Sequence, residues 1–156
     1  MKKNKPPVGV VMGSDSDFPI LEEALQVLDS FAVAYEVTVS SAHRSPARTS
    51  AYAKTAVSRG IEVIIVGAGS AAHLAGVIAA ETPLPVIGIP IDSSPLKGID
   101  ALLSTVQMPA GVPVATMAIG KAGARNAAVL AVQILALKDA GLRKKLNAFR
   151  NGLALQ

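Results

Sequence analysis

One short segment combines a side chain for proton transfer with one for anion binding. His43 can exchange protons near neutral pH without a large change in its surroundings, and Arg44 beside it offers a planar fork that suits phosphate. The positive charge of Arg44 disfavours a protonated His43, so we expect a neutral imidazole able to act as a general base. A structural histidine is the weaker alternative, because Ser41 and Ser45 add two hydroxyls to the same segment.

A second polar segment, Gly13–Asp17, lies between an apolar run and a helical pattern. Its glycine permits a tight turn, and hydroxyl and backbone N–H groups at a helix start suit a phosphate. The carboxylate of Asp17 would repel that phosphate, so we expect it to accept hydrogen bonds from ribose hydroxyls. The alternative is that Ser14, Ser16 and Asp17 cap the helix, and taken alone the segment favours this alternative slightly.

Two glycine-rich segments offer close backbone approach to a ligand. In Gly67–His73 the glycines can present N–H groups, and His73 can either contact the ligand or cap the next helix. This segment lacks the acidic residue that a dinucleotide site needs about 20 positions further on. Gly120–Gly123 lacks the full phosphate-loop pattern of nucleoside triphosphatases. His, Asp and Glu are not spaced as metal ligands, so we predict no metal.

Five apolar runs recur along the chain, and helical patterns lie between them. Three are dense in Val and Ile, as expected of parallel strands buried on both faces, whereas the second alternates apolar and polar residues and suits a sheet edge. The expected strands are Val8–Met12, Val33–Val39, Ile61–Val66, Pro85–Ile89 and Val114–Ile119.

The helical patterns carry recognisable start and stop signals. Asp17 is a good N-cap with Pro19 in the first turn, and Ser45-Pro46 starts a second helix that Gly60 ends. The fifth helix is rich in alanine, so we expect it to be buried or packed on another subunit. The expected helices are Phe18–Ser30, Pro46–Arg59, Ala72–Ala80, Pro95–Val106, Gly123–Lys138 and Ala140–Asn151.

Alternating strands and helices predict an α/β fold: a three-layer αβα sandwich with a flavodoxin-like, doubly wound parallel sheet and an extra C-terminal helix. We expect one domain over residues 1–156, with a basic N-terminal tail at 1–7 and the last helix within 140–156. Ligands of such sheets bind beyond the carboxyl ends of the strands. Both histidines of the chain follow predicted strands, which is the strongest indication of a site.

Composition excludes several function classes. The net charge is +4, but residues 8–136 hold seven Lys or Arg against ten Asp or Glu, so the basic character belongs to the two ends. Because no basic stripe carries interleaved aromatics, we predict no nucleic-acid partner. The apolar runs are shorter than the ~20 residues of a membrane span, so we predict no membrane partner. With no cysteine in the chain, we expect a cytoplasmic protein.

Five ordered segments together resemble one known family, N5-carboxyaminoimidazole ribonucleotide mutase, and the likeness covers about residues 8–150. The resemblance implies a cofactor-free reaction of purine biosynthesis on a small ribonucleotide, in which a carboxylate moves from an exocyclic nitrogen to carbon 4 of the imidazole. It also implies a homo-oligomer, an octamer with sites at subunit interfaces. The matching segments are 11–18, 41–46, 67–74, 106–114 and 118–127.

The resemblance implies a role for each matching residue. His43 would be the catalytic proton shuttle, protonating the carbamate nitrogen and later removing the proton from carbon 4. Phe18, Ser70 and Ala75 replace a common Trp, Gly and Pro of the family, which leaves fine rate effects open. The implied substrate-binding residues are Ser14, Ser16, Asp17, Ser41, Arg44, Ala68, Gly69, Ser70 and His73.

Two rival functions are also compatible with parts of the sequence. Aminoimidazole ribonucleotide carboxylases use free carbon dioxide on the same fold, but they typically carry Lys-Gly after the loop histidine where this chain has Arg44-Ser45. A non-enzymatic flavodoxin-like or receiver module is the second rival. A receiver needs a phospho-acceptor Asp after the third strand, and Gly67–Gly69 occupies that place.

Overall fold

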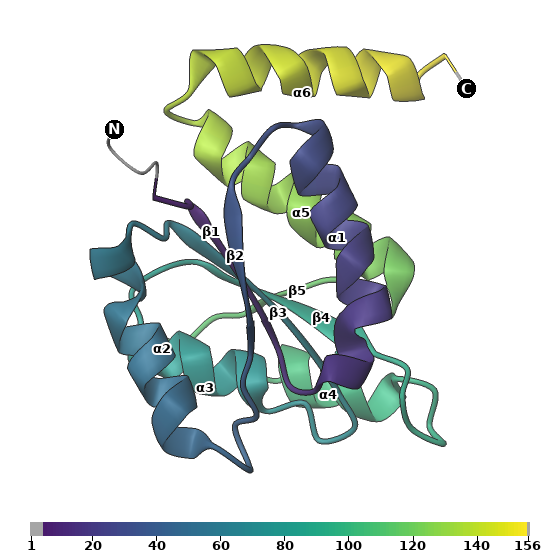
Figure 1. Ribbon diagram of the computed structural model, residues 1–156. Coiled ribbons are helices and arrows are strands. Elements are labelled where there is room, and N and C mark those ends of the chain that lie inside the picture. Colours follow the sequence, from purple (N-terminus) through teal and green to yellow (C-terminus); the bar gives the residue numbers. More distant parts are fainter. Residues whose placement is uncertain (1–4, 156) are drawn as a thin grey trace.

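Strands and helices alternate along the chain in the computed structural model, which describes residues 5–155 (Figure 1). Residues 1–4 of the predicted tail and residue 156 lie outside that range. The elements are β1 (Val8–Met12), the 3-10 turn η1 (Asp15–Asp17), α1 (Phe18–Ser30), β2 (Tyr35–Val39), α2 (Pro46–Arg59), β3 (Val63–Gly69), α3 (Leu74–Glu81), β4 (Val86–Ile91), α4 (Ile99–Val106), β5 (Ala115–Thr116), α5 (Lys121–Ala136) and α6 (Ala140–Leu153).

Within the described residues the strands form one parallel sheet in the order β2-β1-β3-β4-β5. This is the predicted flavodoxin-like order, in which the chain reverses direction across the sheet between β1 and β3. Every residue of β1 and of β4 is buried, whereas β2 is partly exposed at the edge, as its alternating pattern predicted. The carboxyl ends of β1, β2 and β3 therefore meet at one edge of the sheet.

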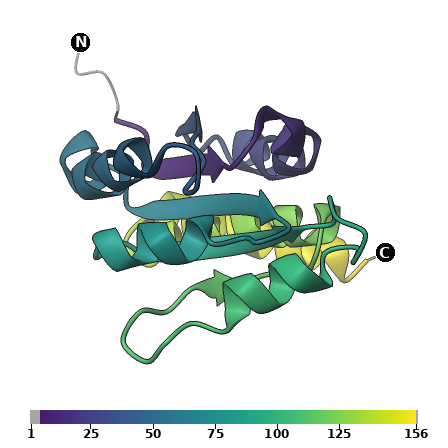
Figure 2. The ribbon, with the colours of Figure 1, turned by 90° about the horizontal axis from the view of Figure 1, so that it is seen from below.

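Helices cover both faces of the sheet, which confirms the three-layer sandwich (Figures 1 and 2). On one face α1 and α5 pack over Val10, Met12 and Ile65, and on the other α2, α3 and α4 pack over Val11, Ile64 and Val66. Aliphatic side chains fill most of both cores, which also contain Phe31 on one face and Tyr52 on the other.

The last helix is the predicted addition to this fold. In Figure 1, α6 runs across the ends of α1 and α5. Leu142 and Leu146 are buried against the core, and the Phe149 ring meets the Phe31 ring edge-on at 5.4 Å. The Lys145 ammonium donates to the Phe31 carbonyl at 2.8 Å. Contacts within the chain therefore hold α6 in place.

The alanines of α5 are buried inside this chain. Ala124, Ala127, Ala128 and Ala131 are fully buried between the sheet, α1 and α6. Burial was one of the two expectations for this helix, and packing within the chain accounts for it. The alanine content of α5 therefore gives no support to a subunit contact.

Some predicted boundaries were wrong, for local reasons. β5 is confined to Ala115–Thr116 because it lies at the sheet edge after Pro113, which has no N–H to donate. α4 begins at Ile99 and not at Pro95, because Lys97 and Gly98 have positive φ angles of 50° and 88°. The segment 107–114 between α4 and β5 projects from the body of the molecule as a loop (Figure 2).

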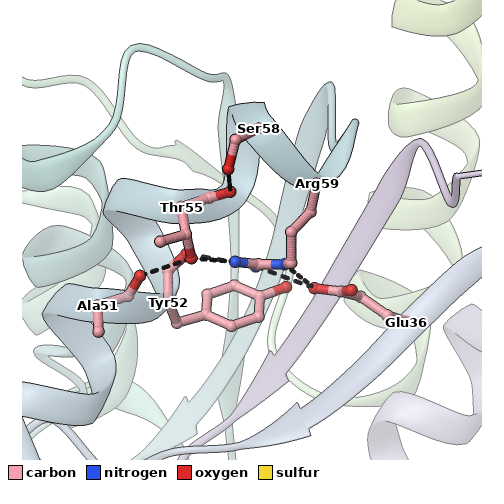
Figure 3. Close-up of polar contacts among 6 residues, drawn as sticks. All are labelled: Glu36, Ala51, Tyr52, Thr55, Ser58 and Arg59. Carbon is pink, nitrogen blue, oxygen red and sulfur yellow. Dashed lines mark hydrogen bonds and ion pairs between the residues drawn. The ribbon is translucent and has the colours of Figure 1, made fainter.

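The C-terminal end of α2 is anchored to β2 by a mixed cluster (Figure 3). Arg59 donates from Nε and Nη2 to one carboxylate oxygen of Glu36, at 3.2 and 3.0 Å. Its guanidinium also lies 4.5 Å from the centre of the Tyr52 ring. Gly60 ends α2 with a φ of 93°, as predicted. This cluster fixes the C-terminal end of α2, and the segment from Ser41 to Arg48 runs into the N-terminal end of the same helix.

Among residues 5–155, no helix is both long and apolar enough to span a bilayer.

Candidate active site

A cavity of about 350 Å³ lies at the carboxyl ends of the strands, where the strand order reverses. The segments after β1, β2 and β3 supply most of its wall, and Ser93 after β4 completes it. The lining residues are Gly13, Ser14, Ser16, Asp17, Ser41, Ala42, His43, Arg44, Ala68, Gly69, Ala71, Leu74 and Ser93. Eight of the ten residues predicted for the site thus face one cavity.

The segment after β1 is closed by a reciprocal cap. The Ser14 hydroxyl accepts from the Ser16 N–H at 3.3 Å, and Asp17 Oδ2 accepts from the Ser14 N–H at 3.1 Å. The cap belongs to η1: Asp17 occupies the N-cap position of α1, but its side chain makes no capping bond to that helix. The prediction that Asp17 caps α1 was therefore wrong, because its carboxylate turns back toward the loop.

Asp17 is a buried carboxyl group on the cavity wall, 5% exposed. Burial raises the pKa of Asp17, with a smaller contribution from the negative charge of Asp15; the Ser14 N–H and the positive charge of Arg44 act in the opposite direction. Burying this group costs stability, and the site nevertheless keeps it at the surface of the cavity. Such a position suits a group that binds a polar ligand.

The segment after β2 is held by three polar contacts. The buried hydroxyls of Ser40 and Thr49 lie 2.8 Å apart and join this segment to α2. The Arg44 N–H donates to the Ser41 hydroxyl at 3.2 Å. Arg44 Nη2 reaches across to the carbonyl of Gly13 at 3.1 Å, so the first two segments are linked by the predicted phosphate-binding arginine.

The segment after β3 brings the second histidine to the first. His43 Nε2 lies 2.8 Å from His73 Nδ1, and the two rings are nearly perpendicular, with centres 4.9 Å apart. His73 stands at the N-cap position of α3, but its side chain makes no capping bond there. The capping alternative for His73 was wrong. Its ring instead contacts the predicted proton shuttle.

The chain also resembles known proteins over almost its whole length. The chain matches the AIR carboxylase family over residues 7–155. It is 57% identical over 149 residues to the N5-carboxyaminoimidazole ribonucleotide mutase of Pyrococcus horikoshii, covering 96% of this chain and 83% of that protein. The mutase of Mycobacterium leprae is 57% identical over 150 residues, covering 96% and 86%.

The chain belongs to the AIR carboxylase family.

Two further relatives extend this result. The phosphoribosylaminoimidazole carboxylase of Candida glabrata is 55% identical over 147 residues, which is 94% of this chain but 25% of that longer protein. The crystal structure of Treponema denticola PurE superposes with a TM-score of 0.86 at 26% identity, covering 95% of this chain and 91% of that one. The fold of this chain is therefore shared with that solved structure at low sequence identity.

Two predicted residues of this AIR carboxylase family site lie outside the cavity lining. His73 is exposed and reaches the site through His43. Ser70 is exposed and has a φ of 54°, in the left-handed region that favours glycine. A glycine at position 70 would adopt this conformation without strain.

Sequence reasoning missed Ser93 as a lining residue. It follows β4, whose carboxyl end was expected to border the site, but one serine among several polar loop residues gave no signal of its own. The structure brings Ser93 against Gly69: a Cβ added to Gly69 would lie 1.9 Å from the Ser93 hydroxyl oxygen. A glycine is needed there because the two loops approach so closely.

The described residues also bring together no group of three or more His, Asp or Glu side chains able to hold a metal.

Proposed function

We propose that this chain is an N5-carboxyaminoimidazole ribonucleotide mutase. The observation that carries the proposal is the joint presence of His43, Arg44 and Asp17 on one cavity at the switch in strand order. Relatives that are 52–57% identical carry the mutase name, which supports the same activity here. The rival of a non-enzymatic flavodoxin-like module finds no support among these relatives.

His43 would act as both acid and base in this reaction. His43 takes up a proton from solvent and donates it to the carbamate nitrogen, and the N–C bond breaks to give carbon dioxide and aminoimidazole ribonucleotide. Carbon 4 then attacks the carbon dioxide trapped beside it, and His43 removes the proton from carbon 4 to restore the aromatic ring. The histidine ends the cycle in its starting protonation state, as a group that serves first as acid and then as base must.

The other residues of the cavity would hold the substrate in place. Arg44 with the hydroxyls of Ser14, Ser16 and Ser41 would bind the phosphate. Asp17 would accept hydrogen bonds from ribose hydroxyls through Oδ1, since Oδ2 is occupied by the Ser14 N–H. The backbone at Ala68 and Gly69 would border the base and the migrating carboxylate, with Ser70 and His73 at the rim. Such enclosure keeps the released carbon dioxide close to carbon 4.

The test follows the migrating carbon. Substrate labelled with carbon-13 in its carbamate group is incubated with the protein in unlabelled bicarbonate. A mutase retains the label in the carboxylate on carbon 4 and needs no added bicarbonate. An aminoimidazole ribonucleotide carboxylase instead converts aminoimidazole ribonucleotide at a rate that rises with bicarbonate, and that result would replace the proposed function with the carboxylase alternative.

We also propose that the protein is a homo-oligomer, an octamer. The support in this chain is an apolar stripe on α4: Ile99, Leu103 and Val106 are all exposed at helical spacing on that helix, and a contiguous exposed apolar patch favours an interface. Light scattering should then give eight times the chain mass of 15.9 kDa.

The cytoplasmic location expected from the sequence stays a prediction, to be checked by cell fractionation.

A further inference from the structure

A second cavity of about 550 Å³ adjoins the candidate active site. The two cavities share the residues Gly13, Ser14, Ser41 and Arg44. The second extends past Arg44 toward the start of α2, where Ser45 and Arg48 line it. Together they form one continuous binding region with Arg44 in its middle.

Because two carboxylates also line this region, the positive charge of one arginine does not balance the negative charge of a bound phosphate. Asp15 and Asp17 line the two cavities together with Arg44, so these three side chains carry a formal charge of −1. A phosphate monoester brings a further charge of about −1.5 to −2 at pH 7. Arg48 is the other arginine or lysine that lines the two cavities among residues 5–155. It raises the formal charge of the region to zero before the phosphate binds.

The position of Arg48 is fixed by the backbone around it. One guanidinium nitrogen, Nη2, donates to the carbonyl of Val39 at the end of β2. A guanidinium carries five N–H donors, so this bond leaves donors free to face the cavity. α2 is held in register at its start by the Ser40–Thr49 hydroxyl pair and at its end by the Arg59–Glu36 ion pair. Arg48 is therefore presented at the mouth of the cavity by a fixed helix.

We propose that Arg48 is a second phosphate-binding residue of this site, working with Arg44 on the 5′-phosphate of the ribonucleotide. The inference rests on the proposed function, since it deepens the account of how that substrate is bound. Arg44 belongs to the wall that the two cavities share, with Ser14 and Ser41, and Arg48 lines the second cavity. Charge-assisted hydrogen bonds from both arginines then fix the phosphate while His43 acts on the base.

Binding of ribose 5-phosphate tests this assignment without turnover. Titration calorimetry at low ionic strength measures its dissociation constant for the parent protein and for Arg48→Ala, Arg48→Lys and Lys54→Ala, with ribose as the ligand that lacks phosphate. We expect Arg48→Ala to weaken binding of ribose 5-phosphate about tenfold and to leave binding of ribose unchanged. Arg48→Lys recovers part of the loss, since it keeps the charge without the fork.

Lys54→Ala is the matched control. Lys54 lies on the same helix, is exposed and pairs with Glu81, so its loss removes one charge of α2 away from the cavity. An equal loss of affinity in Lys54→Ala and Arg48→Ala, or no loss in Arg48→Ala, overturns the proposal. Thermal unfolding and circular dichroism establish that each variant is folded.

The same set of proteins separates this inference from the function on which it rests. If the parent protein binds ribose 5-phosphate through Arg48 but leaves the labelled carbamate substrate unchanged, the mutase function is refuted and the phosphate assignment stands. If the parent converts the substrate and Arg48→Ala has an unchanged Michaelis constant and an unchanged affinity for ribose 5-phosphate, the assignment of Arg48 is refuted and the function stands.

Discussion

His43 Nε2 and His73 Nδ1 lie 2.8 Å apart, although the two residues are 30 positions apart in the chain. A neutral imidazole carries one N–H, so in this pair one ring donates and the other accepts. The contact occupies Nε2 of His43 and leaves Nδ1 for exchange with another group. The tautomer and orientation of His43 are therefore coupled to His73.

Replacing His73 tests whether that coupling matters. We expect His73→Ala to lower kcat about tenfold, a part of the 10²–10⁴-fold that general acid–base catalysis supplies, with a small change in KM. His73→Gln, whose amide can replace the hydrogen bond, recovers part of the rate. Steady-state kinetics across pH gives both parameters. A normal kcat with a raised KM would mean that His73 contacts the substrate and does not orient His43.

His43→Asn tests the proton shuttle itself. We expect turnover to fall by at least about 10²-fold, since asparagine can hydrogen-bond but cannot exchange protons in this range. His43 is exposed at the cavity, so the melting temperature and the affinity for ribose 5-phosphate should stay close to those of the parent. Near-normal turnover in a folded variant would remove His43 from the mechanism.

The buried carboxyl group of Asp17 predicts a contribution to stability that decreases as pH rises. Burial raises the pKa of Asp17 above its ordinary value of 3.8, so the folded state keeps this proton to higher pH than the unfolded state. The stability that the protonated group contributes is fully present below pH 3.8 and is lost as pH rises through the raised pKa. Asp17→Asn should therefore melt at a higher temperature than the parent at pH 7, and the difference should vanish in acid.

The control for Asp17 is Glu22→Gln, which removes one exposed carboxylate from α1. In melting curves from pH 3 to pH 8, the gain in melting temperature of Asp17→Asn over the parent should shrink toward acid, and Glu22→Gln should show no such pH-dependent gain. Asp17→Asn should also raise KM, because the amide is a poorer partner for ribose hydroxyls. A variant less stable than the parent at pH 7 would contradict the assigned cost of burial.

The close approach of Tyr52 to Gly9 predicts that a substitution of Tyr52 restores stability lost by a substitution of Gly9. The Tyr52 hydroxyl oxygen is buried and makes no hydrogen bond within residues 5–155; a Cβ added to Gly9 would lie 2.3 Å from it and 3.5 Å from the ring carbon that bears it. Gly9→Ala should cost about 1–3 kcal/mol through overpacking, because the added Cβ would meet the hydroxyl oxygen of a ring that is buried and covered on one face by Arg59.

In the double variant Gly9→Ala with Tyr52→Phe, the clashing oxygen is gone and the remaining contact is an ordinary one. We expect the free energy of unfolding to recover by at least about 1 kcal/mol relative to Gly9→Ala. Tyr52→Phe alone should be close to neutral, since it removes a buried hydroxyl without a partner. Urea denaturation of the four proteins measures the coupling, and strict additivity would contradict the predicted contact.

Much of the fold follows from local sequence signals. β1 and α1 occupy the predicted residues, and Pro46 and Gly60 bound α2 as expected, because burial on both faces and helix end signals act over a few residues. The length of β5 was overestimated, because it depends on more than local sequence. Its apolar residues fit a strand pattern, but pairing is limited by the edge position, which local sequence does not encode.

The sequence by itself determined which loops line the candidate site, since Ser-Ala-His-Arg and its neighbours follow apolar strands and such loops meet at one edge of a parallel sheet. The tertiary structure alone decided how their side chains are used. It turned the Asp17 carboxylate to the Ser14 N–H, set His73 against His43, and added Ser93 and Arg48 to the wall. These relations depend on the spacing and register of strands distant in the chain, and a contact between two loops has no signature in either loop alone.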